Sequence, residues 1–167
     1  MPRDFWSART GRTLAFAAAF LSVIALFNAP SNAFASTTRQ IVIDPATGIA
    51  LYGYDPVAFF VDRKPRTGKP EFERRWGGVA WRFVNKGNMK AFLDAPNIYC
   101  PRYGGYGALS VAKGLTTNGK PVFFALHKGK LYFFYSPANR HIWLENPDTY
   151  ILKANQNWEK VRHKLSE

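Results

Sequence analysis

Two apolar segments separated by a two-residue turn constrain the fold of this chain more than any other feature. Val122–His127 and Lys130–Tyr135 flank the pair Lys128-Gly129, a spacing typical of an antiparallel β-hairpin. Side chains alternate between the two faces of a strand, and both faces of this hairpin are largely apolar. We therefore expect it to lie centrally in the fold, covered on both sides.

A second hairpin is predicted around Gly77-Gly78. A two-residue turn there places three pairs of residues opposite each other on one face: Trp76 with Val79, Arg74 with Trp81, and Phe72 with Phe83. The other face carries Glu73 opposite Arg82, a pair of opposite charges that would face water. One half-buried face and one wet face are typical of an antiparallel sheet.

Helix-capping residues precede several of the remaining segments. Asp55 before Pro56, Asn85, and Ser136 before Pro137 each offer a side-chain oxygen to the first turn of a helix. The predicted helices are Val57–Val61, Lys86–Asp94, Tyr106–Lys113, a segment from Pro137 through Leu144, and Thr149–His163. The pattern predicts the α+β class, with a small antiparallel sheet built from two hairpins and packed with short helices.

The first 35 residues have the composition of a secretory signal peptide. Arginines precede the apolar segment Thr13–Phe27, and Ala33-Phe34-Ala35 supplies the small residues for cleavage before Ser36. The apolar segment is shorter than a typical membrane span of about 20 residues, which favours cleavage; an uncleaved anchor is the alternative. We therefore expect a periplasmic or secreted protein.

Cleavage would leave a chain of the size of one domain. We expect residues 36–51 to form an extended N-terminal segment, with a short strand at Ile41–Ile43, and residues 52–167 to form the domain. The chain has one cysteine, Cys100, so it has no internal disulfide. Cys100 is then a buried thiol, a metal ligand or an intermolecular link.

The chain is strongly basic, with 23 lysine and arginine residues against 11 aspartate and glutamate residues and a net charge of +12. In an exported protein this charge favours anionic lipid head groups, envelope polymers or acidic proteins as partners, and not nucleic acid. The basic residues form no single long block, so a solvated surface is the alternative interpretation.

The segment Tyr99–Ala108 is the predicted binding loop. Pro101 removes a backbone donor, and Gly104-Gly105 permits backbone angles that other residues rarely adopt. Its tyrosines offer rings and hydroxyls, and Arg102 offers a cation for a carboxylate or phosphate. The predicted ligand-binding residues are Tyr54, Asp55, Arg102, Tyr103, Gly104, Gly105 and Tyr106. In the alternative interpretation the tyrosines belong to the core, and Asp55 only caps a helix.

Two motifs occur in order along the chain, Gly-Tyr-Asp-Pro-Val-Ala-Phe-Phe at 53–60 and Tyr-Gly-Gly-Tyr at 103–106. Together with Gly-Lys-Leu-Tyr at 129–132, they resemble the YHS-domain family of small exported bacterial proteins. The resemblance extends from Tyr52 to Trp158. It implies a compact α+β domain and an exported location, and the wider superfamily implies metal binding, usually through cysteine.

The chain departs from this family at the position that matters for metal binding. Members usually carry cysteine directly after the Tyr-Gly-Gly-Tyr motif, where this chain has Gly107; its cysteine is Cys100. Copper or zinc would take thiolate and imidazole ligands, and Cys100 with His127 is the predicted pair. The chain contains neither a Gly-x-Ser-x-Gly motif nor a glycine-rich phosphate loop, and we expect no enzyme.

The sequence therefore predicts an exported, non-enzymatic binding protein for a metal ion or small ligand at the Tyr99–Ala108 loop. The alternative is a module that uses its basic face to bind a protein or the envelope surface. The dependence of binding on salt distinguishes the two functions. Association with a charged surface weakens as ionic strength rises, whereas metal binding by a thiolate hardly depends on salt and weakens at low pH.

Overall fold

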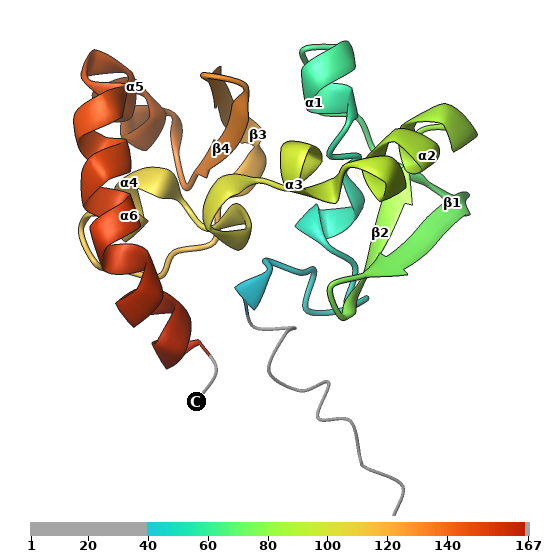
Figure 1. The fold of residues 1–167 in the computed structure, drawn as a ribbon, viewed down its shortest axis with the longest axis horizontal. Coiled ribbons are helices and arrows are strands. Elements are labelled where there is room, and N and C mark those ends of the chain that lie inside the picture. Colours follow the sequence, from blue (N-terminus) through green and yellow to red (C-terminus); the bar gives the residue numbers. More distant parts are fainter. Residues whose placement is uncertain (1–39, 166–167) are drawn as a thin grey trace, which may run out of the picture. The chain divides into compact units, whose positions relative to one another are not determined.

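The computed structural model describes residues 40–165, which form an α+β domain (Figure 1). Its elements are η2 (Leu51–Gly53), α1 (Ala58–Val61), β1 (Lys69–Trp76), β2 (Val79–Phe83), α2 (Lys86–Asp94), α3 (Pro96–Tyr99), η3 (Arg102–Gly105), α4 (Ala108–Ala112), β3 (Lys120–His127), β4 (Lys130–Phe134), α5 (Pro137–Glu145) and α6 (Pro147–Lys164). The predicted fold class is confirmed. The predicted signal peptide, and residues 36–39 of the predicted N-terminal segment, lie outside the described residues.

The β3–β4 hairpin forms at the predicted place. Lys128 and Gly129 make the turn with positive φ angles of 47° and 68°. β4 is buried along Leu131–Phe134, whereas β3 is only partly covered and its Val122 is 50% exposed. Burial on both faces is therefore confirmed for β4. It is only partial for β3, whose Ala125 belongs to one hydrophobic cluster while Phe124 and Leu126 pack against the other.

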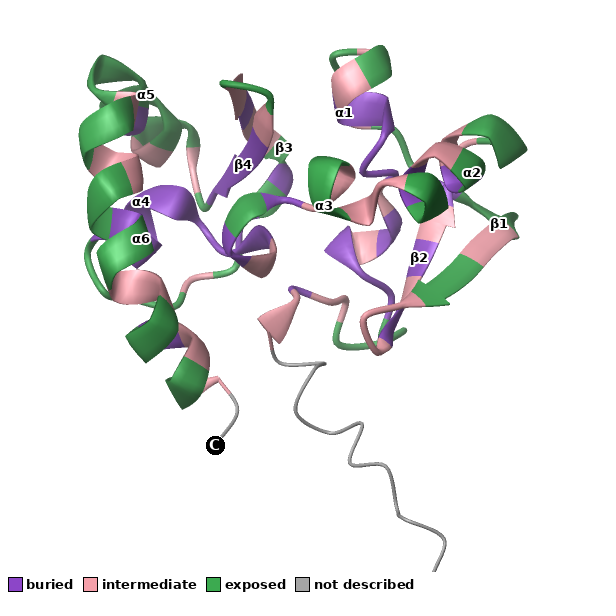
Figure 2. Cartoon of the chain, in the orientation of Figure 1, coloured by how far each residue is buried: buried purple, intermediate pink, exposed green. Residues whose placement is uncertain are grey.

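The two clusters lie on opposite faces of β4, and Figure 2 shows this strand buried. What we call the N-terminal cluster contains Ala50, Leu51, Val57, Phe59, Val79, Trp81, Phe83, Met89, Phe92, Leu131 and Phe133. The C-terminal cluster contains Val42, Tyr103, Tyr106, Ala108, Val111, Ala112, Ala125, Tyr132, Phe134, Trp143 and Ala154. Successive residues of β4 thus alternate between the clusters, as strand geometry requires.

Within residues 40–165 each hairpin forms its own two-stranded sheet. The two hairpins that we predicted as one small sheet are joined by side chains instead. Phe59 of α1 contacts Phe124 and Phe133, with ring centroids 4.9 Å and 5.2 Å apart. The sheets therefore pack through the N-terminal cluster, where aromatic edges and faces meet.

The register of the β1–β2 hairpin is as predicted near the turn and shifts farther from it. Glu73 lies opposite Arg82, with 2.9 Å between Glu73 Oε2 and Arg82 Nε. Beyond this pair the register shifts, so that Phe83 lies opposite Lys69 and the predicted pairing of Phe83 with Phe72 is wrong. Extra residues in one strand of a pair bulge outward and leave the pattern of the other strand unchanged.

The predicted helix caps are present. Asn85 and Ser136 each accept a hydrogen bond from a backbone N–H in the first turn of α2 and α5, at 2.8 Å and 3.2 Å. α6 begins two residues earlier than predicted, because Asn146 caps it and Pro147 fits its first turn. α4 is shorter than predicted, because Tyr106 has extended backbone at the end of η3.

The segment before η2 is tied to the rest of the domain. The Val42 N–H donates to the Gly104 carbonyl at 2.8 Å, and the Ala50 N–H donates to the Ala80 carbonyl at 2.8 Å. The short strand predicted here is an isolated bridge between Ile43 and Ala50. Within residues 40–165, no helix is both long enough and apolar enough to cross a membrane.

Candidate functional site

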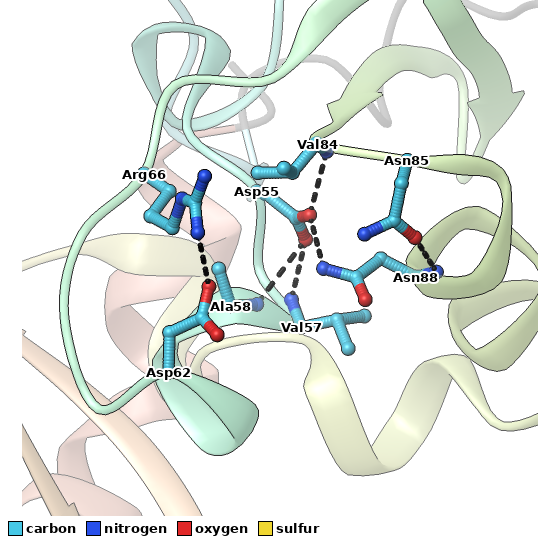
Figure 3. Close-up of polar contacts among 8 residues, drawn as sticks. All are labelled: Asp55, Val57, Ala58, Asp62, Arg66, Val84, Asn85 and Asn88. Atoms are coloured by element: carbon cyan, nitrogen blue, oxygen red, sulfur yellow. Dashed lines mark hydrogen bonds and ion pairs between the residues drawn. The ribbon is translucent and has the colours of Figure 1, made fainter.

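Asp55 is fully buried and both of its carboxylate oxygens are used within the fold (Figure 3). Oδ1 accepts hydrogen bonds from the backbone N–H groups of Val57 at 2.8 Å and Ala58 at 3.3 Å, which begin α1. Oδ2 accepts from the Val84 N–H at 2.8 Å and from Asn88 Nδ2 at 2.7 Å. The capping interpretation is confirmed, and four donors of the protein itself occupy the oxygens that we expected to face a ligand.

The predicted tyrosines take part in packing. Tyr54 is half-buried against the N-terminal cluster and bridges to Thr67. Tyr103 is only 4% exposed, and its hydroxyl donates to Asn155 Oδ1 of α6 at 3.0 Å. Burial, with a smaller contribution from Tyr132, raises the pKa of Tyr103 to about 12. Tyr103 is therefore a core residue, as in the alternative interpretation of the loop.

Arg102 and the two glycines fix the loop against its neighbours. Arg102 is exposed; its Nη2 donates to Asn155 Oδ1 at 3.4 Å, and its guanidinium lies 5.7 Å from the centre of the Tyr103 ring. Gly104 and Gly105 have φ angles of 61° and 92°. A side chain on Gly104 would overlap the carbonyl of Gln40, so this glycine allows the loop to touch the N-terminal segment.

A groove of about 490 Å³ lies next to this loop, and we call it the tryptophan groove. Its walls come from the β1–β2 hairpin, the segment from α3 to η3, and α6, all labelled in Figure 1 except η3. The lining residues are Gln40, Ile41, Trp76, Gly77, Trp81, Asn97, Cys100, Pro101, Gly104, Trp158, Glu159 and Arg162. The half-buried indole rings of Trp76 and Trp158 thus lie next to the buried Trp81, a cysteine, two amides and an ion pair.

The indole rings of the groove are fixed by a hydrogen bond and by contacts with other aromatic rings. Trp81 Nε1 donates to the Trp76 carbonyl at 2.9 Å, and the two rings meet edge to face with centroids 6.1 Å apart. Trp158 packs against Tyr103, with centroids 5.6 Å apart. At the rim, Arg162 Nη2 lies 2.6 Å from Glu159 Oε2. The groove therefore has pre-positioned apolar walls and a charged edge.

The two predicted metal ligands have different surroundings. Cys100 is half-buried in the groove wall, and burial raises the pKa of its thiol from 9.0 to about 12. His127 ends β3, and its Nε2 lies 2.8 Å from Oδ1 of Asp148, which also pairs with Lys128 at 2.8 Å. Among residues 40–165, no group of three or more histidine, cysteine, aspartate or glutamate side chains is placed to hold a metal ion.

Tyr106 lines a second cavity of about 510 Å³ together with Tyr52, Asn118 and Lys164. Asn118 Nδ2 donates to the Tyr52 hydroxyl at 3.3 Å. Burial raises the pKa of Tyr106, so its hydroxyl stays protonated over a wider pH range. The predicted site residues are thus divided, with Gly104 and Cys100 at the tryptophan groove and Tyr106 at this cavity.

Sequence reasoning missed Trp76 and Trp158 as site residues. The sequence places Trp76 on the apolar face of a hairpin, and both tryptophans are only half-buried. The available signal is that a charged residue adjoins each of them, Arg75 before Trp76 and Glu159 after Trp158. Comparison of the chain with protein-family models, curated proteins and solved structures finds no match.

Proposed function

We propose that this protein is an exported, non-enzymatic binding protein that holds a small organic ligand in the tryptophan groove. The observation that carries the proposal is the lining, in which the partly exposed rings of Trp76 and Trp158 adjoin a few polar groups. Small-molecule sites combine mostly apolar walls with polar groups that fix orientation, and their volumes include the groove's 490 Å³. The leader pattern in residues 1–35 supports export.

The lining also defines the kind of ligand. Indole rings bind flat or apolar bodies through their faces and edges. Asn97, Glu159 and Arg162 offer an amide, a carboxylate and a guanidinium at the rim, where they can orient polar substituents. A ligand with an apolar ring system and one or two hydrogen-bonding groups matches both parts of the groove.

Two residues with catalytic potential are held in other roles, which supports binding over catalysis. All four hydrogen bonds to Asp55 come from the protein itself, so its carboxylate is engaged in joining elements. The raised pKa of Cys100, about 12, leaves little of the nucleophilic thiolate near neutral pH. Neither group is activated for proton transfer or covalent chemistry.

The resemblance to the YHS-domain family implies a metal ion in place of an organic ligand. Cys100 lines the same groove, so both hypotheses concern one site. A metal would have to displace a proton that burial holds more tightly than in a free thiol. We therefore favour the organic ligand over copper or zinc.

A fluorescent aromatic anion, 8-anilinonaphthalene-1-sulfonate, tests the groove directly. Trp76→Ala should weaken its binding about tenfold or more, as expected for an aromatic anchor residue. Asn97→Trp should abolish binding by filling the groove while the melting temperature stays close to that of the wild type. Tyr135→Ala, which removes an exposed aromatic outside the groove lining, is the matched control. Unchanged binding in both groove variants would reject the proposed site.

Elemental analysis tests the metal alternative. We would measure copper and zinc in protein purified from the exported fraction and in a Cys100→Ala variant. Near-stoichiometric metal that disappears in the variant would replace the organic-ligand proposal with a metal site. Metal-free protein that binds the dye in the groove would support the proposal.

A further inference from the structure

Helix α6 carries its three lysines on one flank. Lys153, Lys160 and Lys164 follow one another at spacings of seven and four residues, which places them on one side of a helix with 3.6 residues per turn. Asp148 and Glu159 are eleven residues apart and lie on another side. Glu159 lines the tryptophan groove, so the lysines lie away from the proposed ligand site.

A fourth lysine extends this flank from the neighbouring helix. Asn157, between Lys153 and Lys160 on α6, donates through Nδ2 to the Val111 and Ala112 carbonyls at 3.2 Å and 3.0 Å. Lys113 directly follows Ala112 at the end of α4. Its backbone is therefore fixed beside the row of α6 lysines, and we call Lys113, Lys153, Lys160 and Lys164 the lysine face.

The charges of the lysine face are not neutralised within the described part of the chain. The carboxylates of α6 pair elsewhere, Asp148 with Lys128 and Glu159 with Arg162. Within residues 40–165, no carboxylate lies within ion-pair distance of the four lysines, and all four are exposed. Unpaired like charges on one flank repel each other, and an anionic partner would relieve that repulsion.

One exposed leucine accompanies the lysines. Leu115 lies two residues after Lys113 and is 58% exposed. Leu152, seven residues before Glu159, lies on the other flank of α6. The Leu115 N–H donates to the Ser110 carbonyl at 2.9 Å, which holds this segment against the end of α4. Lysines beside exposed aliphatic side chains are typical of a helix that lies on a membrane surface.

We infer that the lysine face docks on a bilayer that contains anionic phospholipids, a function beyond ligand binding in the groove. The basic residues of the face are all lysines, which act as mobile point charges, whereas specific carboxylate recognition by proteins more often uses the fixed fork of arginine. Three lysines along about three turns of α6, with Lys113 beside them, fit a flat, charged surface. Leu115 then reaches the acyl boundary below the head groups.

Sedimentation with vesicles tests this inference on protein purified from the exported fraction. Binding to vesicles of phosphatidylglycerol and phosphatidylcholine should exceed binding to pure phosphatidylcholine and fall as salt rises. Each lysine near an anionic surface contributes about fivefold in affinity, so Lys113→Gln/Lys153→Gln/Lys160→Gln should weaken binding by about 100-fold. Leu115→Ser should weaken binding without changing its dependence on salt.

A second triple variant provides the matched control. Lys64→Gln/Lys69→Gln/Lys86→Gln removes the same net charge from exposed positions outside the lysine face, and it should bind vesicles nearly as well as the wild type. Equal loss in both triple variants would overturn the inference, because net charge alone would then explain binding. Binding to polyglutamate but not to the anionic vesicles would also overturn it, in favour of an acidic protein partner.

Discussion

At the residue scale, burial decides the chemistry of the Tyr99–Ala108 loop. Cys100 and Tyr103 both have a pKa of about 12, and desolvation is the leading cause in each case. An apolar environment disfavours the charged form, so each group keeps its proton in the fold at pH values where an exposed counterpart would ionise. These two side chains of the loop are therefore neutral across the physiological pH range, whereas Arg102 beside them is charged.

This burial makes stability depend on pH in the alkaline range. The unfolded chain ionises first, near pH 9 for Cys100 and near pH 10 for Tyr103, whereas the folded chain ionises near pH 12. The stabilisation is therefore complete below pH 9 and is lost as the pH rises to 12. Urea denaturation between pH 8 and pH 12 should show this fall, and Cys100→Ala should make it shallower. Tyr135→Phe, at an exposed position, should leave the slope unchanged. Equal slopes for Cys100→Ala and the wild type would show that Cys100 does not contribute to the loss of stability.

At the scale of elements, one carboxylate joins three segments of the chain. Asp55 accepts hydrogen bonds from the start of α1, from Val84 after β2 and from Asn88 of α2. Asp55→Ala should lower the free energy of unfolding by about 3 kcal/mol or more, because buried donors lose their acceptor. Asp55→Asn should lower the free energy of unfolding nearly as much, since the amide nitrogen, a hydrogen-bond donor, would then face N–H groups that are also donors. Urea denaturation measures both.

Asp62 provides the control for this prediction. Asp62 belongs to the same part of the chain, and its Oδ2 lies 3.2 Å from Arg66 Nη1 in a pair that is partly exposed (Figure 3). Asp62→Ala should cost less than about 1 kcal/mol, as is usual for surface ion pairs. An Asp55→Asn variant as stable as the wild type would show that the four hydrogen bonds carry no net stabilisation.

The elements also show which features the sequence could predict. The caps at Asn85 and Ser136 and the turn at Lys128-Gly129 were predicted correctly because they depend on a few neighbouring residues. The register shift of β1 and the separation of the two sheets were missed, because they depend on how distant segments pack. The alternation of side chains along a strand indicates neither a register shift nor the way in which two hairpins are arranged.

The candidate site was predicted in part for the same reason. Cys100 and Gly104 do line a groove, as the unusual composition of their loop indicated. Trp76 and Trp158 complete that groove from segments far away in the sequence. An apolar pattern predicts which face of a strand or helix turns inward, but not which of its residues borders an opening.

At the scale of the whole domain, β4 contributes residues to both hydrophobic clusters. Phe133 belongs to the N-terminal cluster and Phe134 to the C-terminal cluster, and both are fully buried. Phe133→Ala and Phe134→Ala should each lower the free energy of unfolding by about 3–5 kcal/mol. Each variant should also destabilise both clusters together. Leu152→Ala, at an exposed position, should change the free energy of unfolding little.

Native-state hydrogen exchange distinguishes coupled from independent clusters. If β4 couples them, either phenylalanine variant lowers the protection of slowly exchanging amides in β2 and in α6 by similar factors. Loss of protection confined to the cluster that carries the substitution would contradict the coupling. Both substitutions are in β4, so the amides of β2 and α6 report on elements that carry no substitution.

The position of β4 also has a consequence for how this chain is made. A polypeptide that emerges from its N-terminal end carries the aromatic residues of the N-terminal cluster long before Leu131 and Phe133 can close it. Most of the chain must therefore leave the ribosome with these side chains uncovered. The N-terminal cluster cannot close until β4 has been synthesised, so the domain folds late in synthesis.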